Sequence, residues 1–75
     1  MPIEFDFSEL RGRIIAKYGN CATFAIAAQM SRAQVSERLN GKTAFKPEEI
    51  YAICSPEVLD IPGTEIGKYF FTLKV

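Results

Sequence analysis

Apolar residues recur at helical spacing in several short segments of the 75-residue chain. In the first segment they repeat every three or four positions and predict a helix with one buried face. The expected buried positions of this helix are Phe7, Leu10, Ile14 and Tyr18. The helix is expected to start near Asp6, which forms a D-x-x-E capping box with Glu9, although Ser8 is a rival cap. Gly19 ends it, because glycine accepts the left-handed conformation that follows many helices.

Two further helices follow at once. Asn20 is suited to cap a helix over Cys21 to about Ala28. Its inward residues are expected to be Phe24, Ala25 and Ala28. Ser31 then opens a third helix as S-x-x-Q with Gln34, and Asn40-Gly41 ends it. Val35 and Leu39 are expected to anchor this helix to the core. Two short helices joined by about three residues predict a helix-turn-helix at about 21–40.

The rest of the chain predicts a fourth helix and a short last one. Pro47 suits a first helical turn, and Ile50, Ile53 and Cys54 are its expected inward residues. Ser55-Pro56 interrupts this helix, and Thr64 opens the last helical turns. Residues 3–5 and 70–75 have high strand propensity, so one small β-ribbon formed by these two segments is possible. The expected fold is all-α, with four to five helices in one domain over residues 1–75.

Composition narrows the class of function. Hydrophobic residues make up 48% of the chain and charged residues 24%, as in ordinary globular proteins. No apolar run is long enough to cross a membrane, and MPIEFDF lacks the basic start of an export signal, so a cytoplasmic protein without membrane contact is expected. Cys21 and Cys54 are expected to be reduced thiols rather than a disulfide. The chain has no histidine, which argues against zinc and against nucleophile–histidine pairs. We therefore expect a binding module without cofactor or small-molecule substrate, not an enzyme.

The zero net charge hides an uneven distribution. Residues 11–46 contain seven basic residues and a single acid, Glu37, whereas both ends of the chain are acidic. One basic surface facing a polyanion would produce this pattern. Solvated helix faces that happen to segregate would produce it as well.

The residues of the central segment resemble the helix-turn-helix of the phage repressor and Cro family. The resemblance rests on Phe24-Ala25, on Met30 to Val35 and on Leu39 to Lys42, which ends in the frequent N-G-K exit. The wider pattern, FDFSELRGRI and EIGKYFFTLKV, is similar to small phage-repressor-like proteins of Gram-positive bacteria and their prophages. This resemblance implies a lambda-repressor-like DNA-binding domain that regulates transcription as a homodimer on a double-stranded operator, in the arrangement of Cro.

Two residues depart from the family pattern. Gln29 stands at the turn position that the family usually fills with glycine. A residue other than glycine adopts the left-handed conformation there at a cost on the order of 1 kcal/mol. Ile26 stands where the family shows an exposed polar residue, and is either repacked core or part of a protein-binding surface.

The third helix of such a motif presents its first residues to base edges in the major groove. The candidate base-reading residues are Arg32, Ala33, Gln34, Ser36 and Glu37. Arg32 fits guanine O6 and N7, with a phosphate clamp or a solvated charge as its alternatives. Gln34 either caps the helix or contacts adenine. Glu37 accepts from cytosine, repels phosphate, or pairs with Arg38 or Arg32.

Phosphate contacts position such a helix without reading sequence. The candidates are Cys21, Thr23, Ser31, Asn40, Lys42, Thr43 and Lys46. Asn40 is alternatively a plain helix end. The remaining basic residues of this region are expected to be solvated or paired; they are Arg11, Arg13, Lys17 and Arg38.

The aromatic residues predict core and dimer contacts, with one of Phe70 and Phe71 available to a partner subunit. The rival to DNA binding is a protein-binding antirepressor or accessory module on the same fold. Zero net charge and Ile26 favour that alternative.

Overall fold

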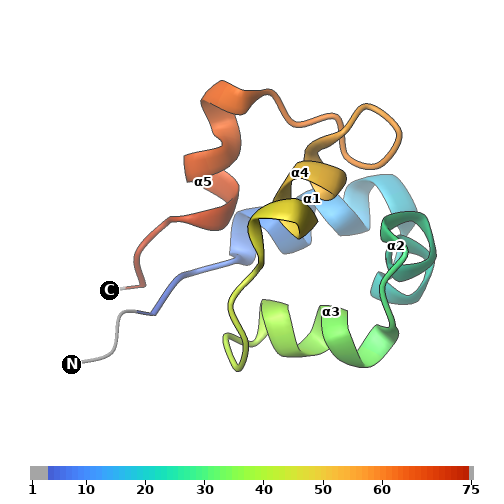
Figure 1. The fold of residues 1–75 in the computed structure, drawn as a ribbon, viewed down its shortest axis with the longest axis horizontal. Helices are drawn as coiled ribbons and strands as arrows, with labels where there is room; N and C mark the ends of the chain where they lie inside the picture. Colours follow the sequence, from blue (N-terminus) through green and yellow to red (C-terminus); the bar gives the residue numbers. More distant parts are fainter. Residues whose placement is uncertain (1–3, 75) are drawn as a thin grey trace.

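A computed structural model describes residues 4–74, and this part of the chain folds into short helices around one core (Figure 1). The elements are α1 (Ser8–Tyr18), α2 (Cys21–Ala28), α3 (Arg32–Leu39), α4 (Pro47–Cys54), the 3₁₀ helix η1 (Gly63–Glu65) and α5 (Ile66–Phe70). The expected all-α class is confirmed. In the view of Figure 1, α3 runs along one edge of the molecule and α5 lies at the opposite edge.

One cluster of buried apolar side chains holds these elements together. Its members from the first three helices are Leu10, Ile14, Phe24, Ala25, Ala28, Val35 and Leu39, and all of them were predicted to face inward. The cluster is completed by residues outside these three helices: Phe7 before α1, Ile53 of α4, Val58, Leu59 and Ile61 of the connection after α4, and Tyr69 and Phe70 of α5. The connection that follows the Ser55-Pro56 break is therefore part of the core, with Val58 and Leu59 buried.

The first helix begins two residues later than Asp6, the expected start. Asp6 still serves its first turn, because the Asp6 carboxylate accepts a hydrogen bond from the Ser8 backbone N–H at 2.8 Å. The Ser8 hydroxyl donates a second hydrogen bond to the same carboxylate oxygen, and the bonds from the Ser8 hydroxyl and backbone N–H lower the pKa of the Asp6 carboxyl group. The expected reciprocal bond from Glu9 is not formed, so the D-x-x-E capping box is wrong. Gly19 ends the helix with φ 81°, in the left-handed region as predicted.

The first and last described segments lie side by side (Figure 1) but make a single antiparallel bridge, Phe5 with Leu73. The predicted terminal ribbon is thus reduced to one bridge within residues 4–74; Ile3 and Val75 lie outside the described residues. Aromatic rings reinforce this junction: Phe5 packs on Phe71 with ring centroids 5.7 Å apart. Of the two adjacent C-terminal phenylalanines, Phe70 is buried and Phe71 is 51% exposed.

The two cysteines are free thiols in the structure, and both are half-buried. Burial raises the pKa of the Cys54 thiol, which keeps it protonated near neutral pH. Among residues 4–74, no helix combines the length and the apolar character that a membrane crossing requires.

Candidate nucleic-acid interface

The second and third helices form a compact unit, residues 20–39, which we call the α2–α3 unit. Asn20 caps α2 as predicted, since its side-chain oxygen accepts a hydrogen bond from the Thr23 N–H at 2.8 Å. Three residues then connect α2 to α3. The first, Gln29, is left-handed with φ 58° and ψ 41°, although it is not glycine. The Met30 N–H bonds back to the Ala25 carbonyl at 2.9 Å, which closes the turn against α2.

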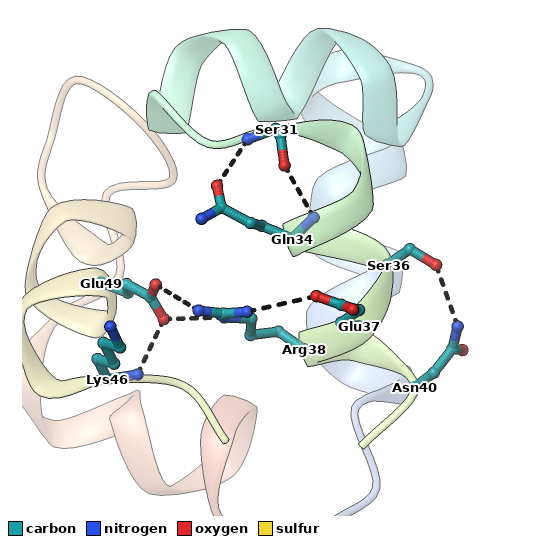
Figure 2. Close-up of polar contacts among 8 residues, drawn as sticks. All are labelled: Ser31, Gln34, Ser36, Glu37, Arg38, Asn40, Lys46 and Glu49. Atoms are coloured by element: carbon teal, nitrogen blue, oxygen red, sulfur yellow. Dashed lines mark hydrogen bonds and ion pairs between the residues drawn. The ribbon is translucent and has the colours of Figure 1, made fainter. Parts of the chain in front are cut away.

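The start of α3 is fixed by a capping box (Figure 2). The Ser31 hydroxyl accepts from the Gln34 N–H at 3.0 Å, and the Gln34 side-chain oxygen accepts from the Ser31 N–H at 2.9 Å. The capping role of Gln34 is therefore confirmed. Its amide nitrogen takes part in neither bond, so the base contact stays a prediction.

The outward surface of α3 carries the other four residues expected to read bases. Arg32, Ala33, Ser36 and Glu37 are exposed, while Val35 and Leu39 of the same helix are buried. Helical periodicity placed these residues correctly. A Glu37 carboxylate oxygen also lies 3.9 Å from Arg38 Nη1, so the pairing given as an alternative for Glu37 is present, and base contact by these four residues stays a prediction.

A groove of about 750 Å³ separates the start of α2 from the outward surface of α3. Its lining residues are Arg11, Asn20, Cys21, Ala22, Thr23, Arg32, Ala33, Val35, Ser36 and Leu39. Two of them are arginines and none is an acid, in a chain with equal numbers of basic and acidic residues. The groove brings together five of the predicted site residues. It also includes Arg11, which the sequence placed among the solvated or paired basic residues.

The remaining predicted phosphate contacts do not line this groove. Ser31, Lys42, Thr43 and Lys46 are exposed, and Lys46 is the residue before the first turn of α4. Asn40 ends α3 and is engaged within the protein: its side-chain oxygen accepts from Arg11 Nη2 at 2.8 Å, and its side-chain nitrogen donates to Ser36 Oγ at 3.2 Å. Asn40 is thus more than a plain helix end.

Arg38 lies on the opposite side of α3 from Ser36 and Asn40 (Figure 2). Its side chain is 7% exposed, and its guanidinium donates two hydrogen bonds to the Glu49 carboxylate of α4, at 3.1 and 3.0 Å. The Glu49 carboxylate also accepts the Lys46 backbone N–H at 2.9 Å. The Arg38 bonds hold the pKa of Glu49 below its ordinary value and raise that of Arg38. Of the two alternatives for Arg38, pairing is correct, and its positive charge does not contribute to the groove.

Comparison with known proteins identifies a family and a similar solved structure. A family model described as "Protein of unknown function (DUF739)" matches residues 3–73. The chain is also similar to the solution structure of the modulator of repression (MOR) of the temperate bacteriophage TP901-1 from Lactococcus lactis. That similarity has a TM-score of 0.77 and 40% sequence identity, and covers 89% of this chain and 88% of the other. No curated protein matches the sequence. The solved relative is a phage regulatory protein, which supports the phage regulatory part of the resemblance drawn from the sequence but not the repressor and Cro family specifically.

Proposed function

The chain belongs to the family described as "Protein of unknown function (DUF739)", and we propose that it is a phage or prophage regulator that binds double-stranded DNA sequence-specifically. It acts by binding alone, without catalysis or cofactor. The α2–α3 unit serves as its helix-turn-helix. The observation that carries the proposal is the acid-free groove with its two arginines beside the exposed surface of α3.

The groove has the properties that a DNA backbone requires. The first turn of α2 forms one wall, and helix starts favour anions because their N–H groups and dipole face outward. Arg32 stands on the opposite wall, at the first position of α3. A phosphate chain in this groove would bring base edges to the exposed residues of α3, as in helix-turn-helix complexes.

The experiment begins with selection from a random duplex pool at moderate salt. Fluorescence anisotropy then compares the enriched duplex with a scrambled one. A two-fold symmetric site bound at least about a thousandfold more tightly than the scramble is the expected result for a homodimeric regulator. If each subunit neutralises about four phosphates, the slope of log K against log salt is near −7 for a dimer.

Arg32→Ala tests the base-reading role directly. It is expected to cost about 1–3 kcal/mol on the selected site and to relax the preference at one base pair. Lys68→Ala removes the same charge from the exposed surface of α5, away from the groove, and serves as the matched control. If the two variants lose the same affinity for the selected duplex, Arg32 contributes only sequence-independent electrostatic attraction.

A second candidate is a protein-binding modulator on the same fold, and Ile26 favours it. This isoleucine is 79% exposed on α2, so its reading as repacked core is wrong. The solved relative is a modulator of repression, a name that fits control of another regulator as well as contact with DNA.

The double variant Arg32→Ala, Asn40→Ala separates the two candidates. DNA binding predicts that this variant loses the selected duplex and, in a transcriptional reporter, its regulatory effect. Protein binding predicts that the selection enriches no duplex and that the double variant still regulates the reporter. It also predicts that the Ile26→Ser variant loses its regulatory effect on the reporter.

A further inference from the structure

Arg11 reaches the groove from α1, a helix outside the α2–α3 unit. It lines the groove together with Arg32 of α3, so that the two guanidinium groups come from separate helices. Among residues 4–74, the only arginine that pairs with a carboxylate is Arg38. The charges of Arg11 and Arg32 are therefore available to an anionic ligand in a way that the charge of Arg38 is not.

Asn40 holds the Arg11 side chain at this place. One hydrogen bond joins Arg11 Nη2 to Asn40 Oδ1 at 2.8 Å, and a second joins Asn40 Nδ2 to Ser36 Oγ at 3.2 Å (Figure 2 shows the second). These bonds connect α1 to the exposed surface of α3. A guanidinium has five N–H donors, and within residues 4–74 the Arg11 guanidinium donates a hydrogen bond only to Asn40. Its other donors remain for a ligand.

We propose that Arg11 binds a backbone phosphate of the DNA and that Asn40 is the residue that positions it. This inference rests on the proposed DNA-binding function and adds a contact from α1 to it. The planar guanidinium fork matches two phosphate oxygens, which suits a side chain already fixed in orientation. Asn40, expected from the sequence to touch phosphate itself, thereby acts through Arg11.

The test measures the salt dependence of binding to the selected duplex, by anisotropy between about 50 and 200 mM salt. Arg11→Gln is compared with Lys17→Gln, which removes the same charge from the exposed surface of the same helix but outside the groove. For each bound subunit, Arg11→Gln is expected to reduce the salt slope by about 0.9 and the affinity roughly five- to tenfold at 0.1 M salt. Lys17→Gln is expected to keep the wild-type slope.

Two further variants separate charge from position. Arg11→Lys keeps the charge but loses the fork, so it retains the slope with reduced affinity. Asn40→Ala leaves Arg11 charged but unanchored, so the slope again persists while affinity falls. Thermal unfolding of each variant verifies that the fold is retained.

The possible failures are distinguishable. A wild-type slope for Arg11→Gln, or equal slope losses for Arg11→Gln and Lys17→Gln, would overturn the contact while DNA binding itself stands. If the wild-type protein binds no duplex in a salt-dependent manner, the contact and the proposed function are both refuted.

Discussion

The left-handed Gln29 gives a direct test of the turn between α2 and α3. Its φ of 58° is a conformation that glycine adopts freely and other L-residues adopt at a cost on the order of 1–2 kcal/mol. The Gln29 side chain is exposed and makes no hydrogen bond within residues 4–74, so replacing it with glycine removes no polar contact. The backbone N–H bonds of Gln29 to Ala25 and Ile26 are kept by any residue except proline.

The expected gain from Gln29→Gly follows from two opposing terms. Relief of the left-handed backbone favours the variant, while the greater freedom of glycine in the unfolded chain opposes it by about 0.4–1 kcal/mol. The net effect is a stabilisation of about 0.5–1 kcal/mol. For a domain of this size, that corresponds to a rise in Tm of roughly 2–8 °C.

Thermal and urea unfolding followed by far-UV circular dichroism measure this gain. Ala16→Gly is the matched control, because Ala16 is exposed in the interior of α1 and glycine there costs about 1 kcal/mol. Gln29→Ala keeps the strained backbone and is expected to gain nothing. A Gln29→Gly protein that melts at or below the wild-type temperature would refute the left-handed turn.

Three other substitutions test the elements that position the groove. Ser31→Ala breaks the capping box and is expected to cost about 1 kcal/mol in urea unfolding; a double-mutant cycle with Gln34→Ala should be non-additive, and full additivity would argue against the box. Because Arg38 lowers the pKa of Glu49 in the folded state, Glu49 contributes stability above its unfolded pKa that is lost as the pH falls through its folded pKa. The Tm advantage of the wild type over Glu49→Gln should therefore shrink on acidification, and a pH-independent difference would contradict the pairing. Phe24 is 1% exposed, and Phe24→Ala is expected to lower the free energy of unfolding by about 3–5 kcal/mol, which is much of the total stability of so small a domain. Far-UV circular dichroism of the helices measures this loss, and a variant with wild-type stability would show that Phe24 is not in the core.

The features that the sequence predicted well are those encoded by residues close together. The Asn20 cap, the Ser31–Gln34 box, the Gly19 stop and the Pro47 start each depend on residues no more than a few positions apart. Helical periodicity also separates the exposed surface of α3 from its buried side. These local signals determine where the helices begin and end. The core is then formed by packing the apolar faces of these helices together.

The features that the sequence left open depend on contacts between distant residues. Arg11 and Asn40 are 29 positions apart, and no local pattern indicates that they meet. The burial of Arg38 could have been predicted from the sequence, because Arg38 lies three positions after Val35 on the side of α3 that faces the core. A basic residue on that side needs an acidic partner, and Glu49 in the first turn of α4 supplies it.

The position of Arg38 changes what the zero net charge means for function. A neutral chain favours a protein-binding module over a DNA-binding one only if its charges are evenly mixed over the surface. Here one arginine is neutralised by Glu49 on the inner side of α3, and the groove on the outer side contains Arg11 and Arg32 without an acid. The chain therefore needs no excess of positive charge to present a basic groove. Because the chain has no net charge, it has little long-range attraction for phosphates, and under the proposed function it should bind unrelated duplexes weakly and depend on contacts from α3 for its affinity.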